Sequence, residues 1–401
     1  MPRTPSRRLL AAALLALSVL APTAAAPATA APAAPATRPG TRPGTASPDG
    51  LGPELTARLD RAVEEVRRQA GIPGAVVGLW LPGRGSYVRA SGVADTATGA
   101  PMTTGVFTRI GSETKTFTVT ALLELVDDGL VRLDDPISAY VDGVPCGDTI
   151  TLRQLAGMRS GLFPYSEDPD FDRALESDPT RTFSPQEVLA YGFRHDNDFG
   201  PGEKFEYSNT NLVLLGLVVE KVSGRSLADF VRARVLRPSH LDGTLFPSGA
   251  EFPEPHAQGY SDETPSGEVA DAADWNPSWA WAAGAMISDL PDLRRWAEIV
   301  ATGRLLRPET QRERLTMLPT GFPGTGYGLG IMETGGWIGH NGSIPGYETV
   351  AVHLPEQRAT LVLMINTDIR YQGQEPSTLL ARAITQVVTP DHVYDGSVPP
   401  R

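Results

Sequence analysis

The sequence predicts an α+β fold, in which one antiparallel sheet is built from both ends of the chain and a helical insertion lies between them in the sequence. Strand-like runs occupy residues 75–93 near the start and 327–366 near the end, whereas residues 130–300 are mostly helical segments broken by proline and glycine. A length of 401 residues, 41% of them hydrophobic, allows one large core.

Each element follows from a local pattern. Residues 54–70 form a charged amphipathic helix that ends at Gly71, and residues 75–81 and 86–93 form a hairpin through a Pro-Gly-Arg-Gly turn. Short turns between the last four strands predict an antiparallel meander. In chain order, further helices are expected at 116–129, 151–157, 184–193, 209–224, 226–235, 290–303 and 377–388, and the late strands at 327–333, 336–340, 347–354 and 359–366.

The N-terminus is predicted to be an export signal. Arg3, Arg7 and Arg8 precede an apolar stretch at 9–20 that is too short to span a bilayer, and Ala28-Thr29-Ala30 is typical of a cleavage site. We therefore expect a secreted, extracellular protein without stable membrane insertion. The predicted organisation is a signal peptide at 1–30, a disordered Ala/Pro/Thr-rich linker at 31–52, a hydrolase domain at 53–390 and a C-terminal tail at 391–401.

Composition and motif content exclude several function classes. A net charge of −12, without a basic run outside the N-terminus, argues against nucleic-acid binding. The single cysteine, Cys146, permits no internal disulfide. The six histidines are scattered and no His-Glu-x-x-His or Cys/His cluster occurs, so neither a metal nor a cofactor is expected. The absence of G-x-S-x-G disfavours an α/β-hydrolase. The oligomeric state stays open.

Ser112 and Lys115 form the first candidate motif, Ser112-Glu113-Thr114-Lys115, which runs into a predicted helix. A spacing of three on a helix puts both side chains on one face, with Cβ atoms about 5–6 Å apart. A serine hydroxyl becomes a useful nucleophile when a neighbouring base takes its proton, and a buried lysine amine can be that base. Only three of the 35 basic residues are lysines, and arginine cannot deprotonate. Simple helix capping by Ser112 is the alternative.

Tyr207-Ser208-Asn209 is the second candidate motif. It follows the turn-forming stretch 201–206 and opens an apolar helix. A phenol at such a junction can accept a proton when nearby positive charge favours its ionised form. An asparagine side chain offers both a donor and an acceptor to a substrate amide. Helix capping by Ser208 or Asn209 is the alternative interpretation.

His340-Asn341-Gly342-Ser343 is the third candidate motif, expected where a strand ends. A glycine in this setting allows another backbone, or a substrate, to approach closely. The backbone N–H of Ser343 can then act with the N–H of Ser112 as a pair of oxyanion donors. An ordinary polar β-turn is the alternative.

Ser-x-x-Lys, Tyr-Ser-Asn and His-x-Gly in this order resemble the motifs of the penicillin-recognising serine hydrolases, in particular class C β-lactamases and secreted D-alanyl-D-alanine carboxypeptidases. The stretches 151–162, 278–288 and 327–330 are also similar to that family. The resemblance covers roughly residues 55–390. It implies a β-lactamase/DD-peptidase-like α+β fold, an antiparallel sheet flanked by helices plus an all-helical lobe, with the active site between the sheet and the lobe.

The resemblance implies a role for each matching residue. Ser112 is the expected nucleophile, and Lys115 and Tyr207 are expected to share the general-base role. Asn209 is expected to bind the substrate amide, and His340 to take the place of the third-motif cation. Further substrate or oxyanion contacts are expected from Asn341, Gly342, Ser343 and Trp281.

The expected function is that of an exported serine-type D-alanyl-D-alanine carboxypeptidase. It would cleave peptidoglycan stem peptides through an acyl-serine and bind β-lactams. The stretch Gly328-Leu329-Gly330 is not followed by the arginine that such carboxypeptidases use to hold the substrate carboxylate, and Arg370 is the suggested substitute. A β-lactamase, an esterase or a D-aminopeptidase on the same scaffold is therefore the alternative. A catalytically silent wall-binding homologue would need a broken motif, and all three motifs are intact.

Overall fold

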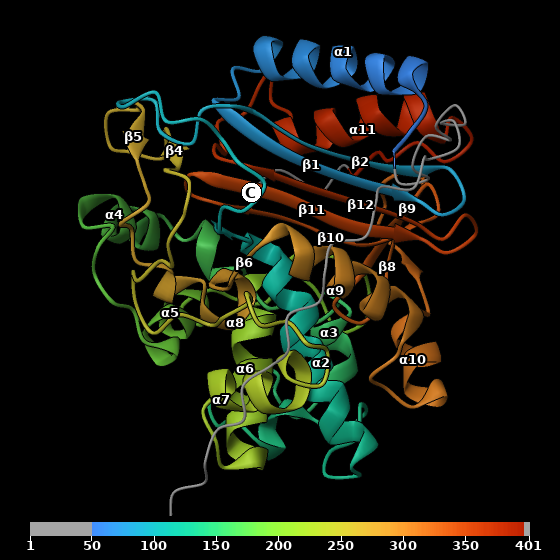
Figure 1. Ribbon diagram of the computed structural model, residues 1–401. Helices are drawn as coiled ribbons and strands as arrows, with labels where there is room; N and C mark the ends of the chain where they lie inside the picture. Colours follow the sequence, from blue (N-terminus) through green and yellow to red (C-terminus); the bar gives the residue numbers. More distant parts are fainter. Residues whose placement is uncertain (1–49, 397–401) are drawn as a thin grey trace, which may run out of the picture. The chain divides into compact units, whose positions relative to one another are not determined.

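The computed structural model describes residues 50–396, and these contain one large antiparallel sheet (Figure 1). Its strand order is β2-β1-β12-β11-β10-β9-β8-β7, so the first strand pairs with the last one. This arrangement confirms the predicted sheet from both chain ends. The strands are β1 (Gly74–Leu81), β2 (Gly85–Gly92), β7 (Leu318–Pro319), β8 (Thr325–Tyr327), β9 (Met332–Thr334), β10 (Trp337–Ile344), β11 (Tyr347–Leu354) and β12 (Ala359–Ile365).

Helices cover both faces of the sheet. On one face α1 (Pro53–Gln69) packs beside α11 (Pro376–Val388), and α11 contacts β11 and β12 (Figure 1). The apolar stripe of α1 buries Leu59 and Val63, as its amphipathic pattern predicts. On the other face α9 (Leu290–Thr302) contacts β1, β10, β11 and β12.

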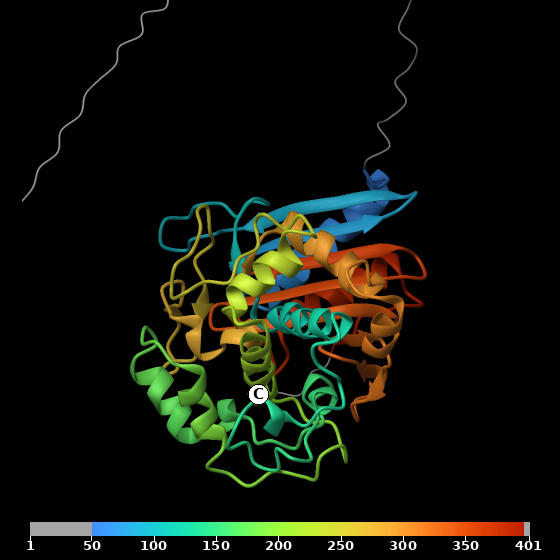
Figure 2. The same cartoon turned by 90° about the horizontal axis from the view of Figure 1, so that it is seen from below.

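The helical lobe is organised around α2 (Thr114–Asp127), which contacts α6 (Asn209–Ser223) and α8 (Trp281–Gly284). Almost every side chain of α2 is buried, so this helix has no face exposed to solvent. Figure 2 shows the lobe from below, with the green α4 and α5 on the side opposite the orange α10. The remaining helices are α3 (Leu152–Ala156), α4 (Pro169–Ser177), α5 (Pro185–Gly192), α7 (Leu227–Val231) and α10 (Pro308–Arg314).

Two late strands differ from the sequence prediction. The stretch expected as one strand at 327–333 is divided between β8 and β9, because Gly330 adopts a φ of +60° in a tight turn between them. Strand β10 was expected to end at His340 but continues to Ile344, because its pairing with β11 extends that far. The third motif therefore lies inside a strand, so the β-turn interpretation is wrong.

Parts of the predicted domain organisation lie outside the residues that the structure describes, including the signal peptide at 1–30 and most of the linker. Beyond residue 390 the chain stays packed on the domain as far as it is described. Tyr394 is buried, and Trp337 Nε1 donates to the His392 carbonyl at 2.8 Å. Among residues 50–396 no helix combines the length and apolarity needed to cross a membrane.

Candidate active site

Ser112 sits in a 3₁₀ turn, Gly111–Glu113, which leads directly into α2. Gly111 has a φ of +49°, and a Cβ added there would lie 2.7 Å from the backbone nitrogen of Ser343. Both facts require glycine at this position. The turn therefore presses the backbone of the first motif against that of the third. The Ser112 side chain does not cap α2, whose N-cap position is Glu113.

Lys115 lies one turn further along and is fully buried. Its Nζ donates to Ser112 Oγ at 2.9 Å and to the Ala283 carbonyl of α8 at 2.8 Å. These contacts hold the amine against the hydroxyl, as the Ser-x-x-Lys spacing predicts. A nucleophile and a base within hydrogen-bond reach, with the base held by a third group, is the arrangement that activated serine chemistry requires.

Tyr207 brings the second motif to the first. It immediately precedes Ser208, the N-cap of α6, and its half-buried ring lies 4.8 Å from Lys115 Nζ. The ring is also 6.2 Å from that of His340 in β10. The three motifs, which are far apart in the sequence, thus converge around one lysine.

His340 is neutral, contrary to its expected role as the third-motif cation. Its Nδ1 lies 2.5 Å from the Asn341 carbonyl, which can only accept, so the proton resides on Nδ1. Its Nε2 then accepts from the hydroxyl of Tyr327 at 3.1 Å. Burial, reinforced by the positive charge of Lys115, lowers the pKa of His340 to about 3. His340 therefore occupies the place of the third-motif cation without carrying a positive charge.

Gly342 and Ser343 form the wall of the site opposite α2. A Cβ at Gly342 would lie 2.0 Å from the Ile110 carbonyl, so β10 runs directly against the segment that carries the nucleophile. Thr349 of β11 donates to the same carbonyl at 3.0 Å. This packing places the backbone of Ser343 beside the Ser112 turn, where the two N–H groups can serve as oxyanion donors.

Asn209 occupies the first position of α6. Its Nδ2 donates to Ser166 Oγ at 3.3 Å. Its Oδ1 is buried and has no hydrogen-bond partner within residues 50–396. A buried acceptor without a hydrogen-bond partner costs free energy unless a ligand donates a hydrogen bond to it. An N–H group of a bound substrate can do so, which is the role that the sequence predicts.

The structure does not bring the side chain of Asn341 into this cluster. Its Nδ2 donates to Glu375 at 2.9 Å, at the start of α11 on the other face of the sheet. Arg370, the suggested substitute for a carboxylate-binding arginine, forms an ion pair with the same Glu375 at 3.5 Å. Trp281 packs its ring on Gly216 of α6, where an added Cβ would lie 2.8 Å from the indole. Substrate contacts by these residues stay predictions.

Three further residues support the site and were not singled out from the sequence. Tyr327 is buried and orients His340. Its position directly before Gly328, in a stretch similar to the family, is the sequence feature that could have indicated this role. Arg314 is buried behind α2, where it donates to Thr120 Oγ1 at 2.8 Å. Nothing in the local sequence of Arg314 indicates this position.

Glu113 is the third of these residues, and it lies inside the first motif. Its carboxyl group accepts from the Ala351 N–H of β11 at 2.9 Å. Complete burial raises the pKa of this carboxyl well above its usual value. Its hydrogen bond to the Ala351 N–H ties the Ser112 turn to the sheet.

The arrangement can perform acyl transfer. Ser112 Oγ can attack a carbonyl while Lys115, beside Tyr207, takes the proton. The two backbone N–H groups can bind the oxyanion, and water can then hydrolyse the acyl-serine. A nucleophilic serine, a buried lysine and this sheet-and-lobe fold define a serine hydrolase of the Ser-x-x-Lys class.

The chain belongs to the β-lactamase family, whose model matches residues 59–385. It is 30% identical over 316 residues to a D-aminopeptidase of Brucella anthropi, an alignment that covers 77% of this chain and 59% of that protein. The curated relatives it matches first are thus longer, and this chain spans about three fifths of their length.

Two solved structures extend the comparison. A D-stereospecific amidohydrolase from Streptomyces sp. has a TM-score of 0.75 at 32% identity, covering 84% of this chain and 99% of that one. A D-amino acid amidase from Ochrobactrum anthropi SV3, complexed with D-phenylalanine, has a TM-score of 0.75 at 28% identity, with coverages of 84% and 99%.

Proposed function

We propose that this protein hydrolyses amide bonds formed by the carboxyl group of a D-amino acid whose α-amino group is free. In this proposal it acts as a D-amino-acid amidase or D-aminopeptidase through an acyl-Ser112 intermediate. The named activities of its relatives support the D configuration. They favour this alternative over the D-alanyl-D-alanine carboxypeptidase expected from the motifs. The predicted signal peptide further supports the proposal that the enzyme is exported.

The observation that carries the proposal is an acidic cavity of about 600 Å³. Ser166 lines this cavity, and its hydroxyl accepts from Asn209 of the second motif. Apolar walls come from Phe171 and Trp279. Its carboxyl groups are those of Glu167, Asp172, Glu176, Asp262 and Glu263.

Two of these carboxyl groups, those of Glu167 and Asp172, are partly buried and lie beside other carboxylates. Within residues 50–396 neither Glu167 nor Asp172 has an ion-pair partner. Partial burial, and after it the charges of neighbouring carboxylates, raise the pKa of both groups, so both negative charges are disfavoured where they stand. A substrate ammonium group would stabilise these charges. The apolar walls suit an amino-acid side chain next to it.

The same electrostatics disfavour a carboxypeptidase. Such an enzyme must bind the terminal carboxylate of its substrate, which calls for a cation near the site. His340 is neutral, and Arg370 is paired with Glu375. An acidic cavity beside Asn209 would repel a carboxylate and attract an amine.

The proposal is tested by steady-state hydrolysis of D-phenylalaninamide, L-phenylalaninamide and an N-acetylated peptide ending in D-alanyl-D-alanine. We expect the D-amide to be cleaved with a kcat/KM at least 10²-fold above that of either other compound. Faster release of the terminal D-alanine from the blocked peptide would restore the carboxypeptidase hypothesis. The Ser112→Ala variant serves as the control for contaminating hydrolases.

A further inference from the structure

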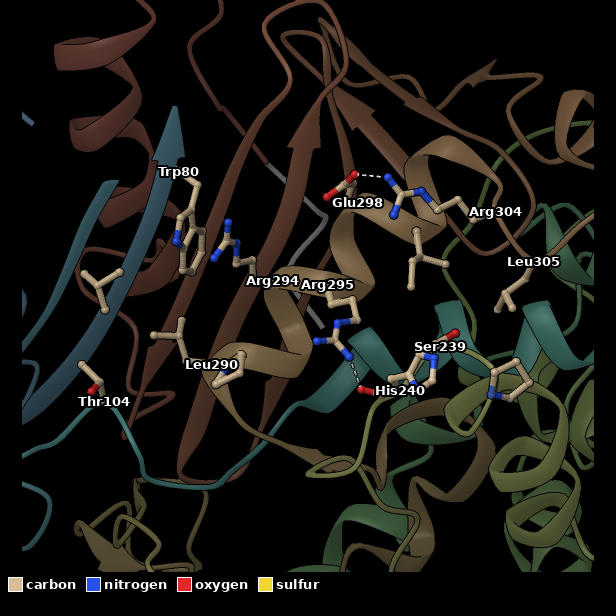
Figure 3. A pocket seen from close by; sticks show the side chains of 14 residues that line it. Trp80, Thr104, Ser239, His240, Leu290, Arg294, Arg295, Glu298, Arg304 and Leu305 are labelled. Atoms are coloured by element: carbon tan, nitrogen blue, oxygen red, sulfur yellow. Dashed lines mark hydrogen bonds and ion pairs between the residues drawn. The ribbon is translucent and has the colours of Figure 1, made fainter. Parts of the chain in front are cut away.

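A second cavity, of about 740 Å³, shares no residue with the Ser112 site (Figure 3). It lies between the β1–β2 hairpin and α9, and residues 238–240 and 304–305 complete its rim. Its volume is in the range of sites that bind small molecules. Nothing in the proposed hydrolysis uses it.

The cavity is cationic although the protein carries a net charge of −12. Three of its residues are arginines and one is a glutamate. Arg304 pairs with that glutamate, Glu298, at 2.5 Å, and Arg295 donates to the His240 carbonyl (Figure 3). A carbonyl neutralises no charge, so two of the three positive charges are left uncompensated within the cavity.

Arg294 is the cation best placed to meet a ligand. Its guanidinium lies over the ring of Trp80, 4.5 Å from the ring centroid (Figure 3). No carboxylate of residues 50–396 forms an ion pair with it. Stacking on the ring holds the planar group in one orientation, and its N–H donors stay available. The nearby charge of Glu298 attracts it and the adjacent charge of Arg295 repels it, and an anion between the two arginines would relieve that repulsion.

The cavity also has an apolar floor and one unsatisfied polar group. Leu290 and Ile299 of α9 are buried beneath it, and Trp80 is half-buried at its side. The hydroxyl of Ser239, which lines the cavity, is buried and has no hydrogen-bond partner within residues 50–396. A buried hydroxyl without a hydrogen-bond partner costs free energy, and a hydrogen bond to a ligand oxygen would recover it.

We propose that this cavity binds a small organic anion, with its carboxylate or phosphate at Arg294 beside Arg295 and its apolar part against Trp80 and Leu290. A planar carboxylate and a tetrahedral phosphate each present two oxygens that can accept the two parallel N–H hydrogen bonds of a guanidinium. The site is separate from the Ser112 chemistry, so ligand binding and hydrolysis can be measured independently.

The test is isothermal titration calorimetry of the whole protein with three probes: benzoate, phenyl phosphate and the uncharged benzamide. We expect saturable binding of at least one of the two anions and none of benzamide. The tighter anion identifies the oxyanion that the site prefers. Arg294→Gln should weaken the binding of that anion at least tenfold. Arg294→Lys should weaken it by a smaller factor, because lysine keeps the charge but loses the two parallel hydrogen bonds of a guanidinium.

Arg132→Gln is the matched control, because it removes the same charge from a side chain that is 87% exposed and lies outside the cavity. It should bind the anion as tightly as the wild type does. Hydrolysis of D-phenylalaninamide should be unchanged in Arg294→Lys. Equal binding to the Arg294 and Arg132 variants, competition between the anion and the amide, or no saturable binding would each overturn the proposal. Near-UV circular dichroism identifies any variant that does not fold.

Discussion

The hydroxyl of Ser112 receives a hydrogen bond from a fully buried amine, and this contact leads to the first prediction. Ser112→Ala should reduce turnover by at least about 10³-fold and abolish covalent labelling by a β-lactam, because no other nucleophile takes its place. Ser208→Ala is the control, since the Ser208 hydroxyl is buried without a partner among residues 50–396. Intact-mass spectrometry checks the labelling. An adduct on the Ser112 variant would place the nucleophile elsewhere.

Tyr207 and Tyr327 allow a matched pair of substitutions. Tyr207→Phe should lower kcat by about 10²–10³-fold if the phenol transfers protons, a typical range for general acid–base groups. Tyr327→Phe removes a hydroxyl that orients His340, so we expect a smaller loss of kcat and a loss of about 1–3 kcal/mol of stability. Single-turnover acylation and denaturant unfolding separate the two effects. A near-wild-type rate in Tyr207→Phe would leave Lys115 as the sole base.

The buried, neutral His340 should make stability depend on pH. Its pKa falls from about 6.5 when unfolded to about 3 when folded, so between these values the unfolded chain binds more protons. Stability should therefore fall as the pH drops from 6.5 towards 3, by up to about 4 kcal/mol from this residue. His340→Gln should flatten that part of the curve, as measured by urea unfolding at a series of pH values. Identical pH slopes in the two proteins would contradict a neutral, buried imidazole.

At the scale of elements, the contact between β10 and the Ser112 turn depends on the absence of a side chain at Gly342. Gly342→Ala would place a Cβ 2.0 Å from the Ile110 carbonyl, and the strand must move away. We expect a loss of about 2–4 kcal/mol in stability and a loss of acylation, since the oxyanion donors separate. Gly105→Ala is the control, because a Cβ there has nothing within 4 Å. Thermal unfolding and β-lactam labelling measure both effects, and similar behaviour of the two variants would refute the contact.

How far the sequence predicts these elements depends on how local their causes are. The hydrogen bond between Lys115 and Ser112 follows from the helical spacing of the two residues, and strand β12 follows from a nearly continuous apolar run. The extension of β10 to Ile344 does not, because it is set by pairing with β11. The neutrality of His340 depends on burial by segments distant in the sequence.

At the scale of the whole molecule, two cavities differ in the sign of the charge that lines them. The acidic cavity combines residues 166–176 with residues 262–264, and the cationic cavity combines the β1–β2 hairpin with α9. The sequence predicts neither cavity, because each is lined by separate segments, and each segment alone has the composition of an ordinary charged surface. The net charge of −12 does not indicate that the two cavities carry opposite charges.

The acidic cavity leads to a prediction about substrate affinity. Glu167→Gln should raise KM for D-phenylalaninamide by about tenfold or more, because it removes a negative charge that faces the ammonium group. Its effect on kcat should be smaller, since Glu167 is not part of the Ser112 cluster. Glu309→Gln, at an exposed position outside the cavity, is the matched control. Steady-state kinetics checks the difference, and equal KM values for the two variants would argue against this binding mode.

The central claim is that Ser112 acts on substrates whose ammonium group lies in the acidic cavity. The most direct test compares kcat/KM for D-phenylalaninamide and N-acetyl-D-phenylalaninamide, which differ only in the charge and size of the amino end. We predict that acetylation lowers kcat/KM at least 10²-fold, and that Glu167→Gln narrows this ratio. An acetylated amide that is cleaved as well as the free one would contradict the account.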